Sequence, residues 1–150
     1  IFLSELVSIF AFNCVVVALT ILIHFEVLYR MADTVPSLRI RPRLRVLLGM
    51  FGAFVAHVIE IWIFAAAYFI LLRSGNFGSL AGNFDGSLID CCYFSFTTYT
   101  SLGFGDVEPF GQMRFLTGLE ALTGLMLITW TASFMFLQMQ KFWGSEKKTD

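Results

Sequence analysis

The sequence predicts an all-α integral membrane protein with three transmembrane helices, a shorter re-entrant helix and an irregular loop that follows it. The chain has 150 residues, of which 57% are hydrophobic and only 14% are charged, whereas soluble domains are far less apolar. Three apolar runs reach the length of about 20 residues that a helix needs to cross the hydrocarbon core of a bilayer. The formal net charge of −1 supplies no basic face, so we expect no nucleic-acid partner.

The first apolar run covers residues 6–23, and we expect residues 1–30 to form an N-terminal transmembrane helix. The run follows Glu5 rather than a basic segment and lacks a small-residue cleavage pattern, so we interpret it as a retained helix and not as a signal peptide. Asn13 lies inside it and could hydrogen-bond to another helix. Because the chain starts at Ile1 and not at methionine, native residues could precede it.

Residues 31–45 are predicted to form a cytoplasmic, arginine-rich linker. Pro36 and Pro42 prevent this stretch from continuing as one helix. Basic residues mark the cytoplasmic side of a membrane protein, which places the N-terminus outside and the C-terminus in the cytoplasm. The arginines between the first two runs are Arg30, Arg39, Arg41, Arg43 and Arg45. Four of them lie two residues apart, which does not align them on one helical face, so we expect them to bind membrane lipid headgroups rather than to sense voltage.

Residues 46–143 are predicted to form one domain, followed by a short cytoplasmic tail at 144–150. Its two membrane helices are expected at about 46–72 and 115–139. Residues 74–86 are rich in Gly, Asn and Ser and indicate an exposed outer loop. Residues 87–100 contain no Gly or Pro and are too few to span a bilayer, which favours a re-entrant helix. Asp90 near its start suits the positive end of the helix dipole.

Gly103 and Gly105 flank a single residue directly after the re-entrant helix. Paired glycines allow a conformation that turns successive carbonyls to the same side of the chain. At membrane depth such a backbone is tolerated only where it lines a water-filled path, and there carbonyl oxygens can replace the hydration shell of a cation. Acidic residues at the outer mouth would concentrate cations; these are Asp85, Asp90, Asp106 and Glu108.

The segment Thr97-Thr98-Tyr99-Thr100-Ser101-Leu102-Gly103-Phe104-Gly105-Asp106 resembles the signature of potassium channels. The resemblance covers about residues 46–143, in the order outer helix, pore helix, selectivity filter and inner helix of the prokaryotic type with two transmembrane helices; the first helix is an addition. It implies a homotetrameric channel for potassium, in a membrane that we expect to be a prokaryotic cell membrane. It implies no enzymatic activity and no cofactor, K⁺ being the permeant ion.

Carried over by position, the resemblance assigns the filter to Ser101, Leu102, Gly103, Phe104 and Gly105, with K⁺ held at the first four. It assigns support of the filter to Thr97, Thr98, Thr100, Asp106 and Glu120. Ser101 replaces the family's threonine and Phe104 its commoner tyrosine, and loss of the phenol predicts a filter that inactivates more readily. Thr97 stands where some members carry an acid, which leaves the lateral attachment of Asp106 open.

Three ionisable residues within the apolar runs require partners, because an unpaired charge in a membrane is costly. Glu120 is expected behind the filter, where hydroxyls of the pore helix such as Thr97 or Thr98 would satisfy it. His57 and Glu60 lie three residues apart on one helical face and could pair with each other or reach the pore helix. Structural polar contacts are one interpretation of this pair, and proton sensing is the other.

Gly118 and Gly124 lie in the third apolar run, and Gly124 is a possible gating hinge or a site of close helix packing. If Leu125 faces the ion path, helical periodicity places Thr129, Ala132 and Phe136 on the same face. Phe136 is then the candidate for a hydrophobic constriction.

Four other interpretations remain beside the potassium channel. They are a cation channel that discriminates weakly between Na⁺ and K⁺, a transporter subunit, a non-conducting membrane interaction subunit and an enzyme. The single pore-like loop argues against a transporter and the intact Gly-Phe-Gly-Asp motif against a non-conducting subunit. The two histidines and three cysteines form no recognisable catalytic constellation.

Overall fold

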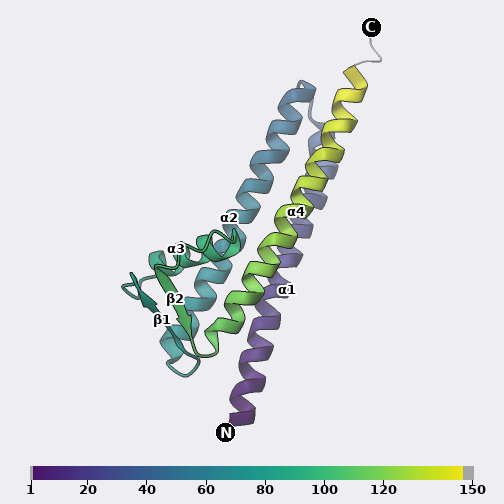
Figure 1. Cartoon of the computed structure of the whole chain (residues 1–150). Coiled ribbons are helices and arrows are strands. Elements are labelled where there is room, and N and C mark those ends of the chain that lie inside the picture. The colour runs from purple at the N-terminus through teal and green to yellow at the C-terminus, as the bar shows by residue number, and fades with distance from the viewer. Residues whose placement is uncertain (1, 147–150) are drawn as a thin grey trace.

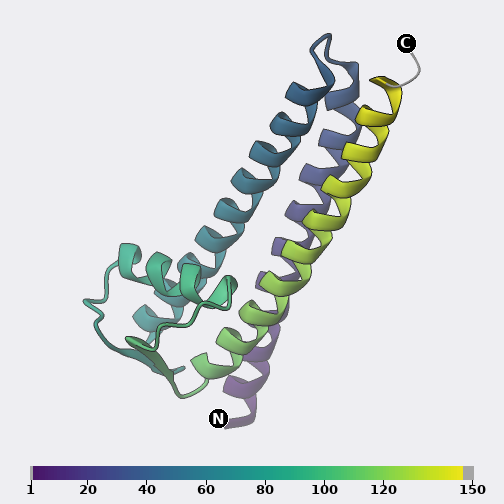
Figure 2. The ribbon, with the colours of Figure 1, turned by 45° about the horizontal axis from the view of Figure 1, so that its top comes forward.

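The computed structural model describes residues 2–146 and contains three long helices that lie side by side (Figures 1 and 2). These are α1 (Phe2–Thr34), α2 (Pro42–Ser74) and α4 (Met113–Glu146). Each is long and apolar enough to cross a membrane, and at 1.5 Å per residue each extends for about 50 Å. The predicted helical membrane fold with three spanning helices is therefore confirmed.

The connection between α1 and α2 is shorter than the predicted linker at 31–45. Helix α1 continues to Thr34, a 3₁₀ turn (η1, Val35–Ser37) follows, and α2 already begins at Pro42. Proline is compatible with the first helical turn because its missing N–H would have no partner there. Arg43 and Arg45 therefore belong to the first turn of α2, while Arg39 and Arg41 lie in the connection.

The re-entrant helix is α3 (Leu88–Tyr99), which lies across α2 and ends against α4 (Figure 2). Its first turn is capped by Ser87, whose hydroxyl accepts a hydrogen bond from the backbone N–H of Asp90. Buried aromatic residues fill the space between α2 and α3, among them Phe64, Tyr68 and Phe94. This packing fixes the end of α3 from which the glycine-containing loop emerges.

Two short strands were not expected from the sequence. Strand β1 (Ser79–Gly82) pairs antiparallel with β2 (Val107–Phe110), so part of the predicted open outer loop is a small sheet. A strand of four residues is too short for its sequence pattern to be distinguished from that of a loop. The pairing needs Gly82, which has a φ of +106° and lies so close to β2 that a Cβ atom there would meet the Asp106 carbonyl oxygen at 2.1 Å.

We predict that Gly124→Ala destabilises the protein while Gly118→Ala does not. A Cβ atom on Gly124 would lie 2.0 Å from the carbonyl oxygen of Tyr99 at the end of α3, whereas one on Gly118 would meet no atom within 4 Å. Overpacking of this kind costs about 1–3 kcal/mol. Thermal unfolding of the two variants in detergent measures the difference, and equal melting temperatures would contradict the predicted close packing.

Candidate ion-conducting site

The loop at 101–106 has an alternating backbone conformation. Ser101, Gly103 and Gly105 have φ angles of +59°, +51° and +79°, whereas Leu102 and Phe104 between them do not have positive φ angles. Ser101 is the single non-glycine residue with a positive φ in the part of the chain that the structure describes. A left-handed conformation at every second residue is the feature that lets successive carbonyls of an extended chain point to the same side.

Backbone hydrogen bonds attach the start of this loop to the end of α3. The N–H of Ser101 donates to the Thr98 carbonyl at 3.0 Å, and the N–H of Gly103 donates to the Thr97 carbonyl, also at 3.0 Å. The hydroxyls of Thr97 and Thr100 bond to carbonyls within their own turn, at Phe94 and Phe96. The C-terminal turn of α3 and the beginning of the loop therefore form one continuous hydrogen-bonded unit.

Asp106 anchors the end of the loop that leads into β2. The hydroxyl of Tyr93 in α3 donates to Asp106 Oδ2 at 2.8 Å, and the backbone N–H of Asn83 donates to the Asp106 carbonyl at 2.8 Å. Position 97 thus takes no part in this attachment, which Tyr93 provides from one turn earlier in α3. The sequence analysis did not single out Tyr93, because a tyrosine in an apolar helix carries no pattern that reveals its partner.

Two acidic residues expected at the outer mouth, Asp85 and Asp90, lie together at the start of α3. Hydrogen bonds from the hydroxyl and the backbone N–H of Ser87 lower the pKa of Asp85 below its ordinary value. The Asp85 N–H in turn donates to Asp90 Oδ2 at 2.8 Å. Asp85 is fully exposed and therefore remains ionised at neutral pH, where its charge faces solvent beside the start of α3.

Glu120 of α4 is completely buried and bonds to α3, but not through the residues expected. Its carboxylate accepts hydrogen bonds from the hydroxyl of Ser95 and, at 2.6 Å, from that of Tyr68 in α2. The expectation that Thr97 or Thr98 satisfies it is therefore wrong. Ser95 faces α4 from the preceding turn of α3, so Glu120 still connects α2, α3 and α4 behind the loop.

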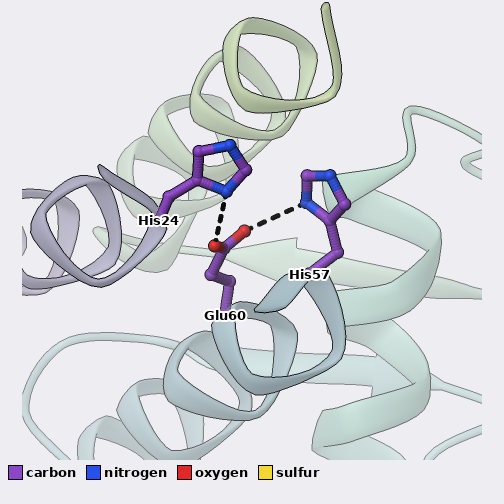
Figure 3. Close-up of side chains that lie close together, drawn as sticks. All are labelled: His24, His57 and Glu60. Atoms are coloured by element: carbon purple, nitrogen blue, oxygen red, sulfur yellow. Dashed lines mark hydrogen bonds and ion pairs between the residues drawn. The ribbon is translucent and has the colours of Figure 1, made fainter. Parts of the chain in front are cut away.

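Glu60 of α2 is the second buried carboxylate. Its partner His57 lies 3.1 Å away through Nδ1, and Tyr99 at the end of α3 donates its hydroxyl to the same carboxylate. The structure adds His24 from α1, whose Nδ1 lies 2.8 Å from Glu60 Oε1 (Figure 3). The sequence analysis missed His24, because a histidine 33 residues before the nearest paired candidate has no spacing that signals the contact.

The face of α4 proposed to line the ion path is exposed in the single chain. Leu125 and Phe136 have exposed fractions of 49% and 58%, and Thr129 and Ala132 are also exposed. Gly124 lies on another side of α4, directly against Tyr99.

The hydrogen bond expected for Asn13 of α1 is absent among the residues that the structure describes, although the Asn13 side chain is buried.

We predict that Ser95→Ala lowers stability by about 1–3 kcal/mol, because it removes a donor from a buried carboxylate. Ser133→Ala is the matched control, since Ser133 is exposed on α4 and bonds only to a carbonyl of its own helix. Thermal unfolding in detergent compares the two variants with the original protein. A melting temperature of Ser95→Ala equal to that of Ser133→Ala would show that the bond to Glu120 contributes no stability.

Comparison with known protein families identifies a match to the central and C-terminal parts of the chain. The family model described as "Ion channel" matches residues 47–141, which extend from the first turns of α2 through α3 and the loop to the last turns of α4. No curated protein and no solved structure matches the chain. The matched segment covers more than half of the sequence and has the helix–re-entrant helix–helix order described above, so the chain belongs to this ion channel family, with a pore domain of the two-helix potassium-channel type.

Proposed function

We propose that the chain forms a tetrameric, potassium-selective channel whose filter is Ser101-Leu102-Gly103-Phe104-Gly105. The observation that carries this proposal is the left-handed conformation of Ser101, Gly103 and Gly105. This conformation supports an arrangement in which the carbonyls of residues 101–104 would point to one side and replace the hydration shell of K⁺. The C-terminal end of α3 adds partial negative charge below them.

The proposal of a tetramer rests on what one chain leaves uncovered. The side chains of Leu102 and Phe104 are 58% and 66% exposed, although the backbone carbonyls of both residues are among those proposed to bind ions. Neighbouring copies around a symmetry axis would cover these side chains and would complete the ring of oxygens, of which one chain supplies a quarter. Thr97, Thr98 and Thr100, together with Asp106 and Glu120, would support the filter through the α3 contacts.

The proposed orientation follows from charge. The connection between α1 and α2 lies at the same end of the molecule as the C-terminal end of α4 (Figure 1). The N-terminus, α3 and the loop that follows α3 lie toward the opposite end (Figure 1). Arginines concentrate in the connection between α1 and α2, so the end that contains it would face the cytoplasm. Phe136 lies in the cytoplasmic half of α4 and would form the constriction, with Gly124 as a possible hinge.

Ion flux through purified protein in liposomes tests the function. We expect a reversal potential that favours K⁺ strongly over Na⁺, and we expect Gly103→Ser to remove this preference, because serine disfavours the φ of +51° at that position. Bi-ionic reversal potentials provide the measurement. Equal permeability in the original protein would instead support a weakly selective cation channel, which the departures at Ser101 and Phe104 favour, and absence of flux across a range of voltages and pH would contradict both.

Phe104→Tyr is expected to slow the decay of current during sustained activation. A tyrosine at this position can hydrogen-bond to the aromatic residues around a filter, whereas Phe104 lacks the hydroxyl. Single-channel or macroscopic recordings from planar bilayers measure the decay. Equal decay in the two proteins would show that the missing hydroxyl does not limit the stability of the filter.

A further inference from the structure

His24, His57 and Glu60 form a cluster at membrane depth that takes no part in the proposed filter. It lies where α1, α2, α3 and α4 meet, and Figure 3 shows both imidazoles directed at the two oxygens of one carboxylate. The side chains of His24 and Glu60 are completely buried, and that of His57 is 17% exposed. Three potential metal ligands on two helices are thus held together inside the protein, and the cluster is accessible through the partly exposed side chain of His57.

The spacing of the cluster is close to that of a metal site. One nitrogen or oxygen from each residue can be chosen so that all three lie within 4.8 Å of one another. The Nδ1 atoms of His24 and His57 lie 2.8 and 3.1 Å from the oxygens of Glu60. Tetrahedral zinc has ligand bonds of about 2.0–2.1 Å, which separates neighbouring ligands by about 3.3 Å, so small side-chain rotations would suffice.

The second nitrogen of each ring meets the same hydroxyl. Thr131 Oγ1 in α4 lies 3.0 Å from His57 Nε2 and 3.2 Å from His24 Nε2. A hydroxyl oxygen can accept from two N–H groups but can donate only one proton. With Glu60 ionised, no pair of neutral tautomers therefore turns all four contacts, two to Glu60 and two to Thr131, into hydrogen bonds.

A cation between the rings and the carboxylate resolves this conflict. Both rings would then donate Nε2–H to Thr131 and present the lone pairs of Nδ1 to the cation beside Glu60. Metal-bound histidines commonly donate their second N–H to a fixed oxygen in this way. The negative charge of Glu60, buried among membrane helices, would also gain the partner that such a charge requires. A proton on one imidazole or on the Glu60 carboxyl would satisfy the same contacts, and metal-binding experiments separate a bound proton from a bound cation.

We propose that His24, His57 and Glu60 form a transition-metal site of the Zn²⁺ class that joins α1 to the pore domain. Two imidazoles and one carboxylate suit Zn²⁺ and its neighbours in the transition series, whereas Ca²⁺ and Mg²⁺ need six or more oxygen ligands. The Tyr99 hydroxyl lies 2.9 Å from His57 Nδ1 and bonds to Glu60, so an oxygen is available next to a fourth coordination position.

The site would connect metal binding to the filter. Tyr99 is the last residue of α3 and stands two residues before Ser101. Its carbonyl also contacts Gly124 of α4. A bound ion would therefore hold α1 and the end of the pore helix in a fixed relation, and metal would regulate the channel rather than pass through it.

Metal binding to the purified full chain, prepared without a histidine tag, tests the proposal. We expect one Zn²⁺ per chain and an increase in melting temperature on addition of Zn²⁺. Because the sequence contains only two histidines, X-ray absorption of the zinc-loaded protein should show two imidazole ligands. Co²⁺ in place of Zn²⁺ should give the visible absorption of a tetrahedral site. Protein that binds no stoichiometric Zn²⁺, or Zn²⁺ without imidazole ligands, would overturn the proposal without any variant.

Variants then identify the ligands. We expect His24→Asn and Glu60→Gln to weaken Zn²⁺ binding by roughly 100-fold or more, and Thr131→Val by about 10-fold, as expected for a residue that orients ligands. Glu26→Gln is the control, since this exposed carboxylate on α1 pairs with Arg30 at the surface. Unchanged affinity in folded His24→Asn and Glu60→Gln, or an equal loss in Glu26→Gln, would refute the assignment.

Discussion

The position of the pore helix depends on two carboxylates that are buried among the membrane helices. Glu120 binds the hydroxyl of Ser95 in the middle of α3, and Glu60 binds that of Tyr99 at its end. Apolar packing against α2 holds α3 in place, and hydrogen bonds to the two carboxylates add strong and directional contacts that fix its rotation. The loop at 101–106 depends on these two bonds for its position, because it is hydrogen-bonded to the last turn of α3.

The sequence predicted the parts of the molecule that depend on pattern. Apolar runs of sufficient length gave the three spanning helices, because a bilayer imposes one length on every helix that crosses it. The run at 87–100 gave the re-entrant helix, which the structure bounds at Leu88–Tyr99. Gly103 and Gly105 indicated a backbone that could turn successive carbonyls to one side, and both glycines have the positive φ angles that such a backbone uses. These features are local, so a single sequence contains the information that specifies them.

Contacts between distant segments could not be predicted in the same way. Glu120 needed a hydroxyl from α3, but the rotation of that helix decided that Ser95 and not Thr97 or Thr98 supplies it. Tyr93 meets Asp106, and His24 meets Glu60 across 36 residues. The β1–β2 pairing likewise joins residues on either side of α3. Each of these contacts depends on how the helices rotate and pack against one another. The residues next to each partner in the sequence do not indicate that rotation.

The added helix α1 changes how copies of this unit can be joined. With three long helices, the N-terminal end of α1 and the C-terminal end of α4 lie at opposite ends of the molecule (Figure 1), whereas a unit made of α2, the loop and α4 alone would begin and finish on the same side. Two copies of residues 2–146 fused head to tail in the same orientation would therefore need another membrane-crossing segment between them. A repeat of the two-helix unit needs no such segment.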